Sequence, residues 1–338
     1  MFKKVFVASF LLICTLSQAQ VGGQNVFQFV NLVASPRQAA LGGKNITIYD
    51  NDVNQGIFNP ASINNEMHNN LAVNYGSYFG EITYGTAAFA HNFKKMNTLH
   101  AGVNYVNYGD FDGYDGNRNP TGNFTGSAIA LSAGWAYQVP KTNLHLGASG
   151  KFISSSLEAY SSTGGSIDLG AIYVNKKNNI NWALVIRNIG TQFTTYSGIK
   201  EDIPTEIIFG FSKELAHVPI RWHVNLENLQ QWDVSFSNPS RSSKSLDGTS
   251  TEEKVSFANN ALRHVIFGVE FLPRRAFNIR LSYNFRRAEE LKILQQSSFS
   301  GLSLGFGLKM NHLKFNYSYS SYTLAANTSL FGLTINFQ

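Results

Sequence analysis

The 338-residue chain is poor in charge and rich in aromatic side chains for a protein of its length. Charged residues make up 14% of it, against about 25% in typical soluble domains, and aromatic residues make up 13%. The formal net charge is only +6 and the basic residues form no stripe, which argues against a nucleic-acid function. The single cysteine, Cys14, excludes a disulfide within the chain.

Residues 1–19 have the pattern of an export signal. Two lysines precede a short apolar run over residues 5–16, and Ser17-Gln18-Ala19 provides a small-x-small cleavage site. The apolar run is shorter than the roughly 20 residues that a membrane-spanning helix needs. We therefore predict cleavage after Ala19, which leaves a mature chain without cysteine. The alternative is a lipoprotein with a lipidated Cys14, but Ile13 stands before it where a small residue is expected.

Residues 20–70 differ from the rest of the chain. They show little alternation, contain several Gly and Asn residues, and include one apolar patch at residues 26–33. We interpret them as a folded hatch or plug segment that precedes a larger domain over residues 71–338.

From about residue 71, apolar and polar residues alternate with period two, as in Phe277-Asn-Ile-Arg-Leu-Ser-Tyr-Asn-Phe285. Successive side chains of a strand point to opposite faces, so each such strand has one apolar and one polar face. We predict an all-β fold of about 14 strands, near 71–78, 82–93, 98–109, 127–138, 143–154, 166–175, 180–190, 205–213, 219–228, 262–272, 276–286, 299–309, 312–320 and 328–337.

The connections between these strands alternate between tight turns and mostly longer polar loops. The loops include 110–126, 155–165, 191–204, 229–261, 287–298 and 321–327. A soluble sandwich would also alternate in hydrophobicity, but short turns at one end and long loops at the other are typical of outer-membrane barrels. The chain also finishes on an alternating strand with a penultimate Phe337. We therefore predict a transmembrane antiparallel β-barrel in the cell outer membrane, in contact with its lipid.

The polar faces of the predicted strands point inward. They carry glycines at 102, 134, 147, 170, 210, 268 and 305, which either let the strands curl or let another backbone approach closely. They also carry charges of both signs: Lys151, Asp168, Arg187, Arg221, Glu227, Glu270, Arg280 and Lys314. We expect these charges to pair across the lumen and to hold the plug, and a charged permeation path is the alternative.

No constellation supports catalysis or a cofactor. Asp50-x-Asp52-x-Asn54 begins like a calcium loop, but Gln55 and Ala61 occupy the positions that require Gly and Glu. The inward histidines 100, 145, 223 and 264 lie on separate strands, without the spacing of a metal motif. We predict no catalytic residue, no metal site, no cofactor and no enzymatic activity.

Two stretches of the N-terminal segment carry a family resemblance: Ala-Ala-Leu41-Gly42-Gly43 and Phe-Asn59-Pro60-Ala61, with Asp50-Asn-Asp52 between them. They resemble the hatch of the FadL-like outer-membrane superfamily. From Gly22 onward they are more similar to the PorQ-like barrels of the Bacteroidetes type IX secretion system, relatives of the PorV barrels. This resemblance implies that Leu41, Gly42, Gly43, Asn59, Pro60 and Ala61 form a hatch motif.

The resemblance also implies a function. It predicts an outer-membrane barrel of the type IX protein secretion and surface-attachment machinery, which anchors a partner at the cell surface and works with other type IX components. Loop 229–261 is then the expected docking segment. The alternative is a FadL-like transporter that takes a small hydrophobic ligand, and an outer-membrane hydrolase lacks a candidate Ser/His/acid set.

Overall fold

The computed structural model describes residues 25–78, 80–94, 97–234, 243–244, 250–251, 255–290, 299–322 and 327–337. The predicted signal peptide and its cleavage site lie outside these residues. None of the described helices is both long and apolar enough to cross a membrane.

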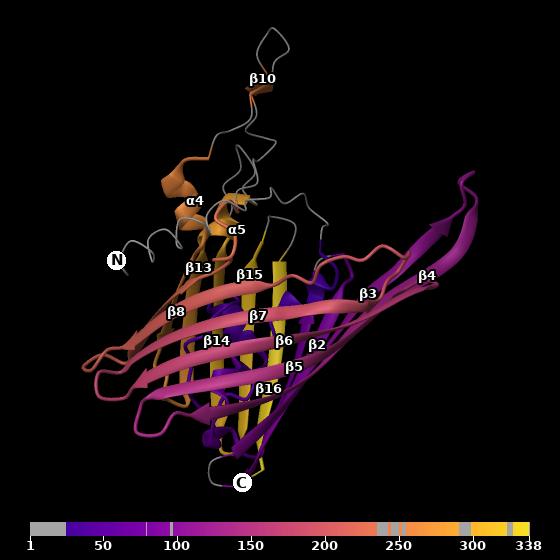
Figure 1. Ribbon diagram of the computed structural model, residues 1–338. Helices are drawn as coiled ribbons and strands as arrows, with labels where there is room; N and C mark the ends of the chain where they lie inside the picture. Colours follow the sequence, from indigo (N-terminus) through magenta and orange to yellow (C-terminus); the bar gives the residue numbers. More distant parts are fainter. Residues whose placement is uncertain are drawn as a thin grey trace, which may run out of the picture.

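Fourteen antiparallel strands form one closed barrel (Figure 1). The barrel closes where the first and last strands pair, from Asn70 with Asn336 to Ser77 with Ser329. Closure leaves no unpaired sheet edge, which a membrane-spanning sheet cannot expose to lipid. The strands are β1 (Asn70–Ser77), β2 (Thr83–Lys94), β3 (Asn97–Tyr114), β4 (Pro120–Gln138), β5 (Leu144–Leu157), β6 (Tyr160–Asn175), β7 (Ile180–Thr194), β8 (Glu206–Glu214), β9 (Ile220–Leu226), β12 (Val265–Phe271), β13 (Phe277–Asn284), β14 (Leu302–Met310), β15 (Leu313–Ser321) and β16 (Asn327–Asn336).

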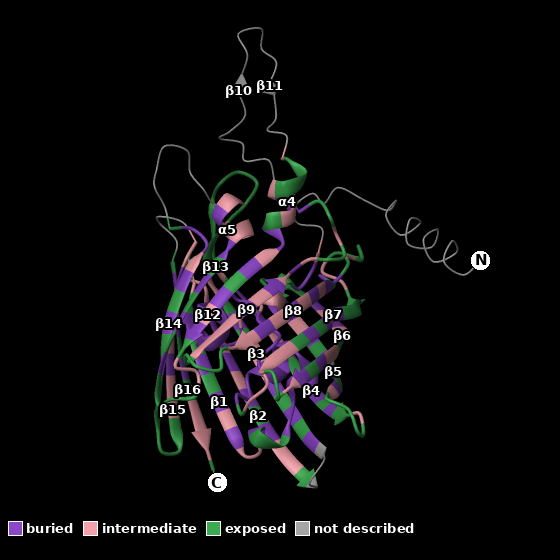
Figure 2. Cartoon of the chain, turned by 90° about the vertical axis from the view of Figure 1, so that its left-hand side faces the viewer, coloured by how far each residue is buried: buried purple, intermediate pink, exposed green. Residues whose placement is uncertain are grey.

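The strands alternate between an exposed, mostly apolar face and a buried face of polar, small and some aliphatic residues, and this alternation is the one that the sequence pattern predicts. In β13 every second residue is exposed, beginning with Phe277, and every other residue is buried (Figure 2). Trp135, Tyr137 and Trp182 lie on the outer surface with about 40% of their area exposed. The outer surface is therefore the apolar one, and the buried polar residues face the lumen.

The barrel has two unlike ends. At one end, β4 and β5, β6 and β7, β8 and β9, β12 and β13, and β14 and β15 are joined by turns of two to five residues. Asn70 and Asn336 also lie at this end, which we call the short-turn end (Figure 1). The opposite end, the long-loop end, carries the connection from β9 to β12.

Two predicted loops are instead strand. The sequence predicts loops over residues 110–126 and 155–165. In the structure β3 continues to Tyr114 and β4 begins at Pro120, and a tight turn at Glu158 joins β5 to β6. Their Ser, Thr, Asn and Gly residues carry no apolar alternation, while the ladder hydrogen bonds that define a strand involve only the backbone.

The ends of two other predicted strands are helical. Helix α4 (Phe257–Arg263) occupies the start of predicted strand 262–272, and the Ser256 hydroxyl caps it by accepting a hydrogen bond from the Asn259 amide. Helix α5 (Phe285–Glu290) replaces the end of predicted strand 276–286, where the Asn284 side chain accepts a hydrogen bond from the Arg287 amide. The β9–β12 connection also contains the two-residue strands β10 (Ser243–Lys244) and β11 (Ser250–Thr251).

Residues 25–68, here called the inner segment, lie inside the barrel (Figure 1). Helix α2 (Pro36–Ala40) packs on β13 to β16. The 3₁₀ turn η2 (Pro60–Ser62) packs on β4 to β6, and helix α3 (Gln55–Phe58) packs on β3. The inner segment thus touches the wall on opposite sides of the lumen. Its elements are η1 (Gln28–Asn31), α2 (Pro36–Ala40), α3 (Gln55–Phe58), η2 (Pro60–Ser62) and η3 (Asn65–Met67).

Candidate functional site

The first half of the predicted hatch motif forms the tight turn that ends α2. Leu41 is fully buried and packs toward Gly268 of β12. Gly42 and Gly43 have φ of +91° and +98°, a region that residues with a Cβ rarely adopt. A Cβ on Gly42 would also overlap the Ile266 side chain. This part of the motif therefore brings the backbone directly against the wall.

The second half of the motif is a capped 3₁₀ turn. The Asn59 side chain accepts a hydrogen bond from the Ala61 amide at 2.9 Å and donates one to the Ile46 carbonyl at 2.8 Å. Pro60 takes the first position of η2, where its missing N–H is tolerated. Ala61 is fully buried. Asn59 thus joins two separate parts of the inner segment.

The inward glycines of the wall face this segment. A Cβ on Gly147 would overlap the backbone of Pro60 and Ala61, and one on Gly170 would overlap the Asn59 side chain. The sequence left two explanations for these glycines, curling of the strands and close approach of another part of the chain. The contacts favour close approach. Atoms of Ile57, Ile63, Thr47, Leu41 and Ala40 lie within about 3 Å of the Cβ positions of Gly102, Gly134, Gly210, Gly268 and Gly305 respectively.

A buried ionic cluster ties the inner segment to the wall around Arg37. The guanidinium Nε lies 2.9 Å from Glu270 of β12, and Nη1 lies 2.8 Å from Asp50 and 3.3 Å from Asp52. Arg280 of β13 lies 3.0 Å from the same Glu270. Arg37 and Glu270 are almost fully buried. Desolvated charges such as these persist only when they are paired, so the cluster fixes α2 in position.

The cluster shifts the ionisation of the inner segment. Burial alone would lower the pKa of Arg37, but the carboxylates of Asp50, Glu270 and Asp52 raise it well above its ordinary value. Burial alone would raise the pKa of Asp50, but Arg37, and after it Lys314 and Arg221, lower it. Both groups are therefore held charged. The Asp50 and Asp52 carboxylates that suggested a calcium loop are occupied by Arg37.

A second ionic cluster holds the next stretch of the inner segment. Lys44 forms ion pairs with Glu206 of β8 and, at 2.8 Å, with Glu227, which follows β9. Burial opposes the charge on Lys44, but these two carboxylates raise its pKa. Arg187 of β7 is also fully buried, with its guanidinium carbon 3.8 Å from the centre of the Phe58 ring. This geometry is a cation–π contact.

Seven of the eight predicted inward wall charges therefore pair with one another or with the inner segment, and Lys314 is the exception among the described residues. Lys151 of β5 lies 2.6 Å from Asp168 of β6, and Arg221 of β9 lies 2.8 Å from Glu214.

Sequence reasoning did not single out Arg37 or Lys44. The signal that could have found them is that each is a lone cation in a segment otherwise expected to be buried.

The inward histidines do not converge. His100 contacts the Val53 carbonyl at 2.9 Å, His223 the Thr47 hydroxyl at 2.9 Å, and His145 the Tyr49 hydroxyl at 3.3 Å. His264 contacts the Glu227 carbonyl at 2.7 Å. Each histidine thus has its own partner, and three of the four bind different parts of the inner segment.

Toward the long-loop end, the lumen holds an apolar cluster, here called the outer apolar cluster. The inner segment contributes Phe27, Phe29 and Val30, and the wall contributes both small and large apolar side chains. Phe27 lies against Gly164 of β6, whose Cβ would come within 2.7 Å of the ring. A second apolar cluster, which includes Ile57, Phe58 and Met67 of the inner segment, lies elsewhere in the lumen. The wall residues of the outer apolar cluster include Tyr84, Val106, Ala128, Ala130, Ile153 and Leu330, with Tyr78, Tyr108 and Tyr196 packed beside it.

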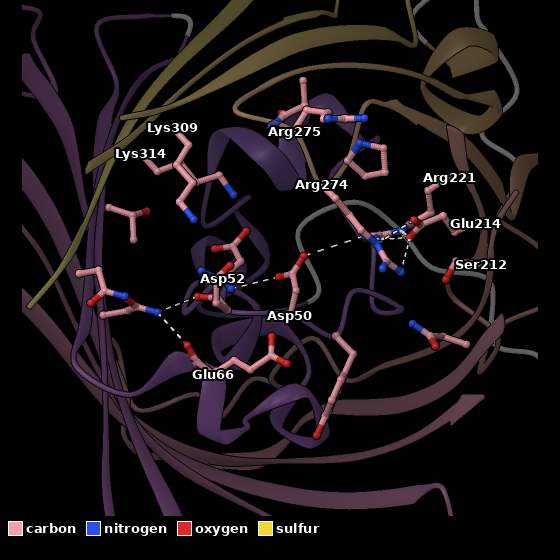
Figure 3. Close-up of a pocket in the computed structure, with 18 of the residues that line it drawn as sticks. Asp50, Asp52, Glu66, Ser212, Glu214, Arg221, Arg274, Arg275, Lys309 and Lys314 are labelled. Carbon is pink, nitrogen blue, oxygen red and sulfur yellow. Dashed lines mark hydrogen bonds and ion pairs between the residues drawn. The ribbon is translucent and has the colours of Figure 1, made fainter. Parts of the chain in front are cut away.

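At the short-turn end, a polar cavity of about 750 Å³ lies between the inner segment and the wall (Figure 3). Asp50, Asp52 and Glu66 of the inner segment line one part of it. The Glu214–Arg221 pair lies on one side, and Lys309 and Lys314 lie together on another (Figure 3). The lining contains six Lys or Arg residues and four carboxylates, so it carries a surplus of positive charge.

No protein-family model and no curated protein matches the chain. Solved structures do. The toluene transporter TodX of Pseudomonas putida matches with a TM-score of 0.58 at 11% identity, over 92% of this chain and 100% of that chain. The toluene transporter TbuX of Ralstonia pickettii matches with a TM-score of 0.54 at 12% identity, over 93% of this chain and 100% of that chain. These likenesses establish the predicted fold class: the chain is a closed 14-strand antiparallel β-barrel with the fold of an outer-membrane protein.

Proposed function

We propose that the chain is an outer-membrane transporter of small hydrophobic molecules and that the inner segment is its hatch. The observation that carries this proposal is the outer apolar cluster. An apolar cluster inside the lumen favours a hydrophobic solute, and this cluster lies toward the long-loop end around the Phe27 and Phe29 rings of the inner segment. The shared fold of two toluene transporters supports the same class of substrate.

The cluster suggests how passage works. On β4 its wall consists of the small side chains of Ala128 and Ala130, whereas the inner segment supplies the Phe27 and Phe29 rings. Movement of the Phe27 and Phe29 rings would therefore open apolar space without moving the wall. Burial of a small apolar solute there gains about 25 cal/mol per Å² of apolar surface removed from water.

The test is uptake of radiolabelled toluene by Gram-negative cells that express the chain and lack their own transporter. Ala130→Trp fills the outer apolar cluster and should reduce uptake at least fivefold. Ala133→Trp is the matched control, because Ala133 is exposed on the outer face of the same strand. Phe27→Ala enlarges the path and should raise uptake. Equal uptake by cells with these three variants and by cells without the barrel would contradict a transport role.

A second candidate function is the anchoring of a partner of the type IX attachment machinery at the cell surface. The family resemblance motivates it, and one surface favours it. At the long-loop end, Trp232, Phe257 and Leu262 are 52%, 75% and 50% exposed, and the Trp232 and Phe257 rings lie 4.8 Å apart. Exposed aromatic and aliphatic side chains of this kind are typical of protein contact sites.

Affinity purification in mild detergent, followed by mass spectrometry, separates the two candidates. An anchor should co-purify secretion components from its native membrane, and deletion of residues 229–261 should release them while the barrel stays inserted. A transporter should keep its uptake and bring down lipid or a small solute only. A partner retained after the deletion would argue against docking on this loop.

A further inference from the structure

Two lysines face each other across neighbouring strands at the short-turn end. Lys309 of β14 and Lys314 of β15 are direct partners in the antiparallel register. Both line the polar cavity and lie together on one side of it (Figure 3). Like charges directly opposite one another destabilise a strand pair. The pair therefore costs the barrel stability unless something negative lies between the ammonium groups.

The described residues provide no such group within ion-pairing distance. No carboxylate oxygen of the described chain lies within 4.0 Å of either ammonium group. Asp50 and Asp52 line the same cavity but are paired with Arg37 at 2.8 and 3.3 Å. Glu214 is likewise engaged, by Arg221 and Arg274, each at 2.8 Å. Three of the four acids that line the cavity thus have closer partners than the two lysines, and the fourth, Glu66, forms no ion pair with either lysine.

Neutral polar groups extend the lysine pair into a row over four neighbouring strands. Thr334 of β16 is the register partner of Lys314. Asn278 of β13 is opposite Gly307 of β14, is 3% exposed, and its Oδ1 has no hydrogen-bond partner among the described residues. All four of these polar residues line the cavity. One wall therefore presents two cations flanked by an amide and a hydroxyl, whose N–H and O–H groups can donate hydrogen bonds to an oxygen-rich ligand.

We propose that this wall binds a small organic anion, with its carboxylate or phosphate groups between Lys309 and Lys314. Charge-assisted hydrogen bonds from the two ammonium groups would hold the anion, and Asn278 and Thr334 would orient it. The volume of about 750 Å³ suits a small metabolite, since ligand sites commonly measure about 300–1,000 Å³. Arg275 and Lys176, which form no ion pair within the described part of the chain, also line the cavity and add to its positive potential.

This site is separate from the path of the proposed transport. The outer apolar cluster lies toward the long-loop end, and the anion site lies at the short-turn end, where it faces the opposite side of the inner segment. The anion is therefore a second ligand, and its binding can be measured on the purified barrel without any flux assay. Failure of one proposal leaves the other standing.

The experiment is a titration of the purified full-length barrel in detergent, at constant ionic strength. Citrate serves as the carboxylate probe and inorganic phosphate as the phosphate probe, with chloride as the reference. Melting temperature and isothermal titration calorimetry are the readouts. We expect saturable binding of one of the two probes by the wild type, with a rise in melting temperature.

The variants make the test specific. Lys309→Gln and Lys314→Gln should each weaken binding at least tenfold, and without the anion each should melt above the wild type because the repulsion is relieved. Lys213→Gln is the matched control, because it removes the same charge from the outward face of β8, beside Trp222 and away from the cavity. Binding that is absent, or that is equal in all three variants, would overturn the proposal.

Discussion

At the scale of single residues, the inner segment is held by contacts that tolerate no extra atom. Gly42 is the clearest case, because it combines a φ of +91° with direct contact to the Ile266 side chain. Glycine populates this backbone region at little cost, and it has no Cβ to meet the wall.

We expect Gly42→Ala to lower the free energy of unfolding by at least about 2 kcal/mol. About 1–2 kcal/mol comes from the left-handed backbone, and about 1–3 kcal/mol comes from overpacking against Ile266. Gly80→Ala is the control, because Gly80 has a φ of +65° but no atom within 4 Å of its Cβ position. Urea unfolding in detergent micelles measures both. Equal losses would show that the steric contact contributes nothing.

Arg37 is the second decisive residue, because three carboxylates depend on it. Removal of one partner from a buried ion pair leaves the others uncompensated and costs about 3–5 kcal/mol. We expect Arg37→Gln to lower the free energy of unfolding by about that amount at pH 7. Arg274→Gln removes an arginine that is 71% exposed, although it also pairs with a carboxylate, and should lose under about 1 kcal/mol.

The same substitution predicts a pH dependence. The pKa of Asp50 is lowered in the folded barrel, so its stabilising effect is present above the unfolded pKa of about 3.9 and is lost as the pH falls through the folded value. The difference in the free energy of unfolding between wild type and Arg37→Gln should therefore become smaller below about pH 4. Urea midpoints at several pH values test this, and a difference that grows with acid would contradict it.

At the scale of elements, the β3–β4 hairpin extends beyond the barrel it belongs to. The pairing of β3 with β2 ends at Asn107, and that of β4 with β5 ends at Gly126, so residues 111–124 pair only with one another. Figure 1 shows this hairpin projecting past the neighbouring strands. Phe111 and Phe124 stack across it with ring centres 5.3 Å apart.

We expect replacement of residues 111–123 by a two-residue turn to leave the barrel folded, because no barrel pairing crosses that stretch. The heat-modified shift in gel mobility and the urea midpoint should stay close to those of the wild type. Deletion of residues 127–133 is the contrasting control, because these residues pair with both β3 and β5. If the shortened hairpin failed to assemble, the extension would be part of the folding unit.

At the scale of the whole molecule, the barrel is wide and its lumen is occupied. Fourteen strands enclose more space than the side chains of the wall can fill. The inner segment occupies that space, and the ionic clusters around Arg37 and Lys44 connect it to the barrel wall. The buried charges are then part of the closure of the lumen and not the lining of an open pore.

We expect planar-bilayer recordings of the wild type to show no stable conductance in the nanosiemens range. Removal of residues 25–68 should open one, if the variant still inserts. Gel mobility and protease resistance report on insertion independently of conductance. A steady large pore in the wild type would contradict a closed lumen.

The sequence by itself determined the strand number, the outward and inward faces, and the two unlike ends of the barrel. These follow from local rules: period-two alternation is set by the geometry of one strand, and turn lengths are read directly from the chain. The same rules missed the extended β3–β4 hairpin, whose residues carry no apolar alternation to mark the backbone pairing. They also missed the start of α5, where the alternation continues to Phe285 but the Asn284 side chain accepts a hydrogen bond from the Arg287 amide of the helix.

Only the tertiary structure decided which charges meet and where the lumen is apolar. Arg37 and Glu270 are 233 residues apart, and nothing in the alternation around either one indicates the other. The pairing of Lys309 with Lys314 is local, but the lack of a carboxylate beside it depends on where Arg37 places Asp50 and Asp52. Such partnerships are set by closure of the barrel and by the path of the inner segment within it, because desolvated charges and close-packed rings depend on neighbours in space and not on neighbours in the chain.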